Sequence, residues 1–282
     1  MRSHSTLQMT AVVGLVFVLA AALAAVVFLN SADNPPKAGG PISEVSIQPT
    51  QQLAALPAPS AQVGTQMNTT LPSALLHLKL VDSRGQTHQL ADYAGKVVVI
   101  SDEMTLCQQT CPLDTTTVTQ IARAVDAAGL GKQVVFLSIT VDPQRDTPAQ
   151  LAAYRKLFTP VPSNWLTLTG SSGAIDSLWH TLGVYLQRVP DKPPLPTNWR
   201  TGQKLHYDID HSDEVFFIDA SGHERFVLEG VPHVNSVAAI PKKLYDYLNA
   251  KGRQGAAHPK STAWTEAQAL QVISWLTQHE VS

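Results

Sequence analysis

The sequence predicts an α/β fold with a mixed β-sheet flanked by helices, preceded by one transmembrane helix. From about residue 71 onward, short apolar runs typical of buried strands alternate with segments of helical periodicity. The turn Ala220-Ser221-Gly222-His223 joins two of the later strands and predicts an antiparallel hairpin beside the parallel strands. Ahead of this domain, nineteen consecutive apolar residues run from Ala11 to Leu29.

The apolar run is long enough to cross a membrane. As a helix rising about 1.5 Å per residue it would be roughly 28 Å long, close to the hydrocarbon thickness of a bilayer. This exceeds the apolar core of a cleavable signal peptide, and Arg2 precedes the run. We therefore expect residues 1–30 to form a cytoplasmic tip and an uncleaved signal anchor. The rest of the chain then lies on the extracytoplasmic side of the cell membrane.

A flexible linker is predicted between the anchor and the domain. Residues 31–70 are rich in Pro, Ala, Gln, Ser and Gly and poor in aromatic residues, a composition that cannot bury a core. The domain is expected over 71–250, and a helical extension over 251–282, because the segment 262–280 is amphipathic. The net charge of −2 and the lack of a basic run argue against nucleic-acid binding.

Each element of the domain follows from apolar periodicity and turn residues. A first hairpin is predicted over 74–81 and 87–90, and buried strands over 97–101, 133–141 and 165–169. Helices are predicted from the cysteines to Gly129, over 148–158 and over 175–182, followed by a hairpin over 214–219 and 224–228 and a last helix over 237–248. Strand, helix and strand imply a right-handed parallel unit. This order is similar to a thioredoxin fold with an insertion between Gly183 and Tyr207.

Cys107 and Cys111 are the only cysteines, and they lie four residues apart directly after the strand predicted at 97–101. At a helix N-terminus this spacing puts both sulfurs on one face, where they can form a disulfide or bind one soft metal ion. The helix dipole and the free amide groups favour a thiolate there, and Pro112 is tolerated in the first turn. Two thiolates and one imidazole form a trigonal site that can hold both Cu(I) and Cu(II), so the copper hypothesis needs a histidine.

Among the ten histidines, His211 is the candidate ligand. It lies just before the strand predicted at 214–219, in a loop that faces the cysteine-bearing helix N-terminus in a thioredoxin-like fold. A polar cap at the entrance of the strand is the purely structural interpretation, because a single histidine is weak evidence of a site. His206 is the second candidate.

Five sequence blocks follow one another over about residues 76–248: Cys107-x-x-x-Cys111-Pro112, Ile139-Thr140-Val141-Asp142-Pro143-Gln144-Arg145-Asp146-Thr147-Pro148, Leu168-Thr169-Gly170-Ser171, Gly183-Val184-Tyr185 and Asp210-His211-Ser212. Together they resemble the Sco/SenC family of membrane-anchored copper proteins. The resemblance implies a thioredoxin-like fold that binds one copper ion, Cu(I) or Cu(II), per chain through Cys107, Cys111 and His211. It also implies copper delivery to, or thiol reduction of, the dinuclear copper centre of cytochrome c oxidase. The expected partner is then the copper-receiving subunit of that oxidase or another copper protein.

The chain departs from the family pattern around the cysteines. Family members usually carry an aromatic-rich approach and a Pro-Asp pair between the cysteines, whereas this chain has Ser101-Asp102-Glu103-Met104-Thr105-Leu106 and Gln108-Gln109-Thr110. Residues that surround metal ligands set copper affinity and redox potential. Carboxylates close to the thiols would raise the thiol pKa values. The Met104 thioether can either bind Cu(I) or pack in the core.

A structural role explains most of the block from Asp142 to Pro148. The Asp-Pro step ends a strand, and Asp146-Thr147-Pro148 is typical of a helix start, with Asp146 or Thr147 as the N-cap. A part in copper binding or partner docking is the alternative.

Other functions fit two cysteines on this fold. A thiol–disulfide oxidoreductase acting on cysteines of a copper-protein partner is the main alternative, although redox thioredoxins generally have two residues between the cysteines and this chain has three. An inert structural disulfide and a zinc site are the others, and an exported zinc site with no evident general base has little hydrolytic use. The resemblance favours an assembly factor over an enzyme, with thiol–disulfide reductase activity as the enzymatic alternative.

Overall fold

The computed structural model describes residues 55–282. The predicted transmembrane segment, Ala11 to Leu29, and most of the predicted linker lie outside the described residues. Over 55–282, none of the helices combines the length and the hydropathy that a bilayer crossing requires.

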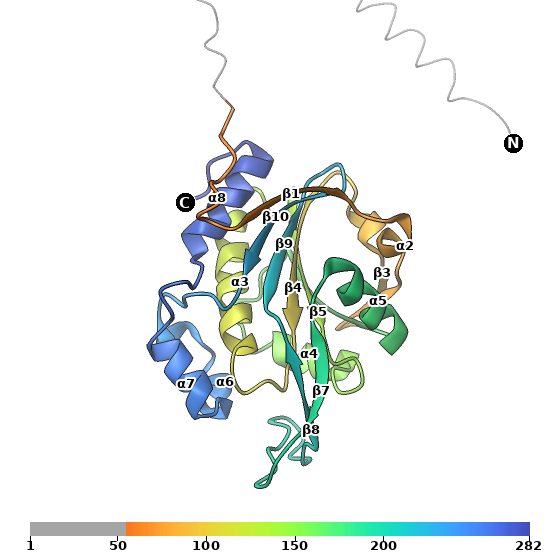
Figure 1. Ribbon diagram of the computed structural model, residues 1–282, viewed down its shortest axis with the longest axis vertical. Helices are drawn as coiled ribbons and strands as arrows, with labels where there is room; N and C mark the ends of the chain where they lie inside the picture. The colour runs from red at the N-terminus through yellow and green to blue at the C-terminus, as the bar shows by residue number, and fades with distance from the viewer. Residues whose placement is uncertain (1–54) are drawn as a thin grey trace, which may run out of the picture. The chain divides into compact units, whose positions relative to one another are not determined.

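Eight strands form one mixed sheet in the spatial order β1-β10-β9-β4-β5-β6-β2-β3 (Figure 1). Their bounds are β1 (Thr65–Thr70), β2 (Leu80–Asp82), β3 (Thr87–His88), β4 (Val97–Glu103), β5 (Val134–Thr140), β6 (Trp165–Gly170), β9 (Glu214–Ile218) and β10 (His223–Glu229). β4, β5 and β6 are parallel, whereas β9 and β10 form the predicted antiparallel hairpin, with β9 paired to β4. The expected mixed sheet is confirmed.

Helices cover both faces of the sheet (Figure 1). They are α2 (Ser73–Leu76), α3 (Cys111–Ala127), α4 (Pro148–Arg155), α5 (Ser172–Leu182), α6 (Lys242–Tyr247), α7 (Ala250–Ala257) and α8 (Glu266–Thr277), with short 3-10 turns η1 (Leu90–Tyr93) and η2 (Val237–Ala239). One apolar cluster lies between the sheet and the helices α3, α4, α6, α7 and α8, and the other lies between the sheet and the helices α2 and α5.

β4 contributes to both clusters because successive side chains of a strand point to opposite faces. Val97 and Val99 belong to the α3 side, whereas Val98 and Ile100 belong to the α5 side. A strand buried on both faces has no polar face, which is why its sequence is a continuous apolar run rather than an alternating one. Its C-terminal end points to the cysteines.

Three elements differ from the sequence predictions. The segment predicted as a strand over 74–81 begins with α2, so β2 is confined to Leu80–Asp82. The helix predicted over 237–248 is interrupted at Pro241 and becomes η2 and α6, because a proline disfavours helical backbone in the residue before it. β1 forms at the end of the segment whose composition predicted a linker, where it pairs with β10 through its backbone. Its side chains are mostly exposed and polar, so apolar periodicity gave no signal.

The insertion before Tyr207 forms a second, two-stranded antiparallel sheet. β7 (Leu186–Pro190) pairs with β8 (Tyr207–His211), and His211 is the last residue of β8 rather than a loop residue. The guanidinium groups of Arg145 and Arg188 lie 3.9 and 3.6 Å from the centre of the Tyr207 ring. The cation–π contact with Arg145 attaches the start of β8 to the body of the domain, whereas Arg188 belongs to β7 and joins the two strands of this sheet.

The C-terminal segment completes the α3 side of the fold. The amphipathic stretch forms α8, which packs against α3 and buries Val272 and Ile273 completely. α7 lies against the cysteine loop, since the Asn249 backbone amide donates to the Gln108 carbonyl at 2.9 Å. A Cβ on Gly252 would lie 2.5 Å from that same carbonyl oxygen.

We expect Gly252→Ala to destabilise the protein by about 1 to 3 kcal/mol, because the added methyl group overpacks a backbone contact that cannot move away. Gly255→Ala in the same helix is the matched control, since its nearest neighbour, Leu113 Cδ2, is 3.9 Å away. Removing that glycine should stabilise the helix by up to about 1 kcal/mol. Urea unfolding of the two variants measures the difference. Equal unfolding free energies would show that α7 does not press on the cysteine loop.

Candidate metal centre

The cysteines lie where β4 gives way to α3. β4 ends at Glu103, and α3 starts at Cys111 with Pro112 in its first turn, as predicted. Both cysteines are free, with Cys107 6% and Cys111 0% exposed. The Gln109 backbone amide donates to Cys107 Sγ at 3.4 Å. The structure thus places two unbridged thiols at and just before a helix N-terminus.

His211 lies beside these thiols although it follows Cys111 by 100 residues. Its Nε2 atom is 3.6 Å from Cys111 Sγ, and its side chain is only 4% exposed. A cavity of about 280 Å³ opens here, and Met104, Cys107, Asp208, His211, Asp213 and Lys251 contribute to its lining. His206, the second candidate, is exposed and does not line this cavity.

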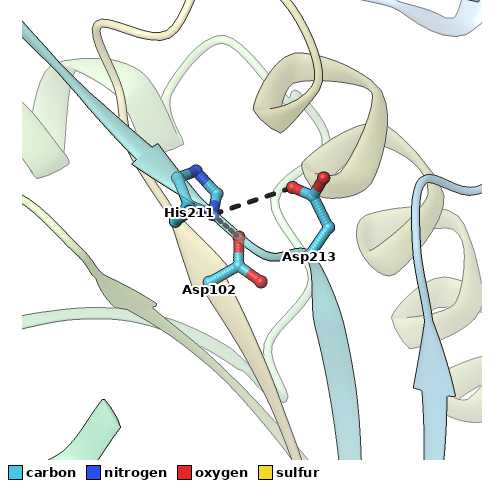
Figure 2. A group of neighbouring side chains, drawn as sticks. All are labelled: Asp102, His211 and Asp213. Carbon is cyan, nitrogen blue, oxygen red and sulfur yellow. Dashed lines mark ion pairs between the residues drawn. The ribbon is translucent and has the colours of Figure 1, made fainter. Parts of the chain in front are cut away.

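Two carboxylates approach the other nitrogen of the His211 ring (Figure 2). Asp102 Oδ2 lies 3.3 Å and Asp213 Oδ1 lies 3.8 Å from His211 Nδ1. Asp102 lies in β4 and is one of the residues before the cysteines at which this chain departs from the family pattern. Asp213 immediately precedes β9. Sequence reasoning missed Asp213, and its place two residues after the candidate histidine is the signal that could have indicated it.

The two acids and the imidazole influence each other strongly. Burial raises the pKa of Asp102 to about 7, although the charge of His211 opposes this change. Burial lowers the pKa of His211, but the charges of Asp102 and Asp213 outweigh it and raise that pKa to about 9. Around neutral pH these pKa values favour an imidazolium at His211, with Asp102 close to the midpoint of its ionisation.

The two thiols are not equivalent. A hydrogen bond from the Cys111 thiol is the main cause that lowers the pKa of Cys107 to about 7. Burial raises the pKa of Cys111 well above its ordinary value, and its hydrogen bond to Cys107 and the charges of Asp213 and Asp102 act in the same direction. The expected effect of the extra carboxylates thus falls on Cys111. Cys107 is the thiol that ionises first.

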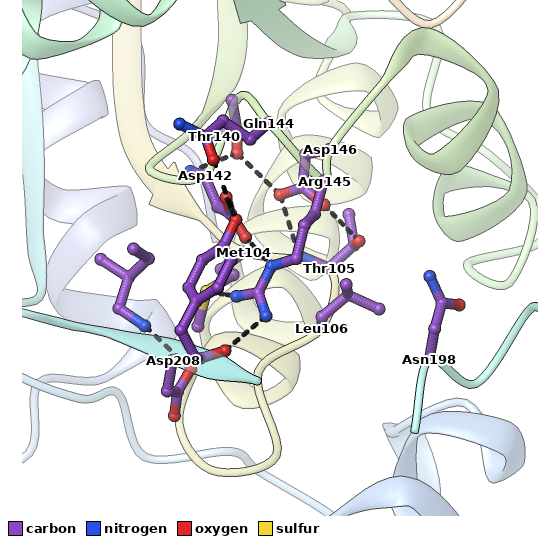
Figure 3. A network of polar contacts seen from close by, with 12 residues as sticks. Met104, Thr105, Leu106, Thr140, Asp142, Gln144, Arg145, Asp146, Asn198 and Asp208 are labelled. Carbon is purple, nitrogen blue, oxygen red and sulfur yellow. Dashed lines mark hydrogen bonds and ion pairs between the residues drawn. The ribbon is translucent and has the colours of Figure 1, made fainter. Parts of the chain in front are cut away.

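The loop that carries Cys107 is held by residues of the Asp142 to Pro148 block (Figure 3). Asp146 accepts hydrogen bonds from the Thr105 amide and hydroxyl and from the Thr140 hydroxyl. Asp146 is therefore not the cap of α4. Thr147 is that cap, since its side chain accepts from the Gln150 amide and Pro148 opens the helix.

Arg145 connects the same block to β8 and to Met104 (Figure 3). Its guanidinium forms an ion pair with Asp142 and donates to the Tyr207 carbonyl. It also donates to Met104 Sδ at 3.7 Å. Met104 is 1% exposed and packs in the apolar cluster on the α5 side, which fits the packing interpretation. The block therefore positions both the cysteine loop and the strand that carries His211.

The donor atoms suit a soft or borderline transition metal. Two sulfurs and one imidazole nitrogen form the donor set that copper and zinc sites use, whereas magnesium and calcium need oxygen ligands. The carboxylates lie at the Nδ1 edge of the ring, away from the edge that faces Cys111. The residues present therefore fit a copper ion held by sulfur and nitrogen.

A mixed sheet with a dithiol at a helix N-terminus and a histidine beside it is typical of a thioredoxin-like fold. The SCO1/SenC family model matches residues 72–249, and the chain belongs to this family. The resemblance stated from the sequence motifs is confirmed.

Relatives of known name match part of the chain. It is 31% identical over 143 residues to the mitochondrial SCO2 homolog of Bos taurus, covering 51% of this chain and 49% of that protein. It is 29% identical over 156 residues to the SCO2-like protein of Rickettsia felis, covering 55% and 69%. The match thus spans about half the length of the bovine relative.

Solved structures of the same family also align with the chain. The copper-bound ScoI of Bradyrhizobium japonicum aligns with 23% identity and a TM-score of 0.44, covering 66% of this chain and 99% of that one. A SCO1/SenC family lipoprotein of Bacillus anthracis aligns with 24% identity and a TM-score of 0.46, covering 65% and 95%.

Asp146 should make stability depend on pH. Burial raises its pKa to about 7, so the folded protein keeps its proton between about pH 4 and pH 7 whereas the unfolded chain does not. The difference in unfolding free energy between wild type and Asp146→Asn should therefore shift against wild type as the pH rises through this range. At about 1.4 kcal/mol per pKa unit, the fall is at most about 4 kcal/mol.

Urea titrations of both proteins at pH 5, 6 and 7.5 test this dependence. Thr147→Ala is the control, because it removes the α4 cap and should lower stability by about 1 kcal/mol at every pH. A constant difference between wild type and Asp146→Asn would mean that the Asp146 carboxylate is ionised throughout the range.

Proposed function

We propose that this protein binds one copper ion, Cu(I) or Cu(II), through Cys107, Cys111 and His211 and carries it to a copper protein. The observation that carries the proposal is the 3.6 Å approach of His211 Nε2 to Cys111 Sγ, with Cys107 in the loop that leads into the same helix N-terminus. Cys107 and His211 also line one small cavity. Such a trigonal set accepts both oxidation states with little change in geometry, which suits uptake and release.

Family membership supports a role in assembling the copper centre of cytochrome c oxidase. We infer that the receiving partner is the copper-binding subunit of that oxidase or another copper protein. In this proposal residues 11–29 anchor the chain in the cell membrane, the part of 31–70 that precedes β1 forms the linker, and the domain with its extension over 251–282 works on the extracytoplasmic side. A tether of this kind raises the effective concentration of the carrier near a membrane-bound acceptor.

The pair of free thiols, with the pKa of Cys107 lowered to about 7, favours thiol–disulfide exchange as a second function. The Cys107 thiolate would attack a disulfide of the partner and form a mixed disulfide, releasing one partner thiol. Cys111 would then attack Cys107, releasing the second partner thiol and leaving Cys107 and Cys111 oxidised. Reduction of a copper-protein disulfide with loss of both free thiols, measured without copper, distinguishes this activity from copper transfer.

His211→Ala tests the copper site. Reduced wild type should bind one copper ion and, with Cu(II), show a sulfur-to-copper charge-transfer band. His211→Ala should lose this band and bind Cu(II) at least about tenfold more weakly, because only two thiolates remain. His206→Ala is the matched control, because that histidine is exposed and should leave both properties unchanged. Copper binding by His211→Ala that equals wild type would overturn the proposed ligand set.

A further inference from the structure

The His211 ring has two edges with different surroundings. Nε2 faces the Cys111 sulfur at 3.6 Å. Nδ1 faces three oxygen atoms: the Ser212 carbonyl at 3.0 Å, Asp102 Oδ2 at 3.3 Å and Asp213 Oδ1 at 3.8 Å. Oxygen atoms of these kinds accept hydrogen bonds and a carbonyl can do nothing else, so the hydrogen belongs on Nδ1. The lone pair of the metal-binding tautomer is then on Nε2, toward the thiols.

Asp102 is the carboxylate that lies closest to this ring. Its Oδ1 accepts from the Glu214 amide at 3.1 Å, which fixes the orientation of the group. Its Oδ2 is buried and accepts no hydrogen bond from any atom of residues 55–282. The nearest ring nitrogen, His211 Nδ1, lies 3.3 Å away. Asp213 is farther from Nδ1, is 17% exposed and already accepts from the Thr110 hydroxyl.

We propose that Asp102 is a positioning residue for the copper ligand His211. It holds the ring with Nε2 toward the Cys111 sulfur and places a carboxylate behind the imidazole. This inference rests on the proposed copper site. A carboxylate behind a ligating imidazole makes the imidazole a stronger donor, and a stronger, more negative ligand set favours Cu(II) over Cu(I). Asp102 thereby lowers the Cu(II)/Cu(I) reduction potential of the site.

The position of Asp102 follows from the register of β4. Asp102 pairs with Ile139 of β5, and its side chain leaves the sheet at the end of the strand, where β8 brings His211. Glu103, the next residue, points to the opposite face, as alternation in a strand requires. Glu103 is 0% exposed and neither of its carboxylate oxygens has a hydrogen-bond partner within 55–282. Glu103 is therefore a buried acid next to Asp102 whose side chain does not point at the His211 ring.

A second cation held by Asp102, His211 Nδ1 and Asp213 is the competing interpretation, because one donor atom of each lies within 4.8 Å of the others. That cation would have to displace the Nδ1 hydrogen. The Ser212 carbonyl, at 3.0 Å, is the nearest of the three oxygens and holds that hydrogen in place. The geometry therefore favours a hydrogen-bonded imidazole over a metal-bridged one.

Asp102→Asn removes the charge and keeps the size of the side chain, and Glu103→Gln makes the same chemical change on the other face. The full chain is purified in a mild detergent and reduced, and Cu(II) and Cu(I) affinities are measured by competition with chelators. The reduction potential of the copper-loaded protein is measured separately. Asp102→Asn should still bind one copper ion with a sulfur-to-copper band.

Its Cu(II) affinity should fall about tenfold relative to its Cu(I) affinity. That ratio corresponds to a rise of about 59 mV in the reduction potential. Glu103→Gln should match wild type. Asp102→Glu, which keeps the charge, should lie closer to wild type than Asp102→Asn. If Asp102→Asn does not fold, Asp102→Ser removes the charge with a smaller side chain and must show the same rise in potential.

Each outcome separates this inference from the proposed function. A wild type that binds no copper, or a His211→Ala variant that binds it normally, defeats the proposed function itself. A normal wild type with an unchanged potential in Asp102→Asn defeats only the role of Asp102. Two copper equivalents in wild type, reduced to one in Asp102→Asn, would establish the second cation site and overturn the positioning role.

Discussion

Asp146 accepts three hydrogen bonds at the base of the loop between β4 and α3, and two of them come from Thr105, two residues before Cys107. This loop has no ladder or helix of its own to fix it, so its place depends on side chains from elsewhere. Trp199 adds a hydrogen bond to the Thr105 carbonyl, and Tyr247 adds one to the Leu106 carbonyl. Two thiols can converge with a distant imidazole only because the chain between them is held at several carbonyl and amide groups.

The acids around this site carry an energetic cost. Burial raises the pKa values of Glu103 and Asp114 well above their ordinary range, in addition to that of Asp102. A protein gains no stability by burying carboxyl groups without partners, and such groups concentrate where function requires them. In this chain they lie at the C-terminal end of β4 and in the first turn of α3, next to the segment that carries the cysteines, and Asp102 contacts His211.

Much of this arrangement could be predicted from the sequence. The apolar runs of β4 and β5 and the periodicity of α3 are direct consequences of burial, and the turn at Gly222 marks the β9–β10 hairpin. β1 and the β7–β8 hairpin could not be predicted, because exposed strands joined by backbone hydrogen bonds have no apolar alternation. The approach of Cys111 and His211 was anticipated through the expected thioredoxin-like topology and the family motifs, since local patterns say nothing about contacts 100 residues apart. The pairing of Asp102 with His211 depends on strand register and needed coordinates.

The segment after residue 249 changes how the boundaries of this protein should be drawn. The family match stops there, yet α7 presses on the loop between the cysteines and α8 closes the apolar layer beside α3. A shortened chain cut at the border of the family match would uncover the hydrophobic surface of α3 and remove the packing of Gly252 against the Gln108 carbonyl. Chimeras that exchange domains among family members should therefore transfer these last two helices together with the thiol loop, as one inseparable unit.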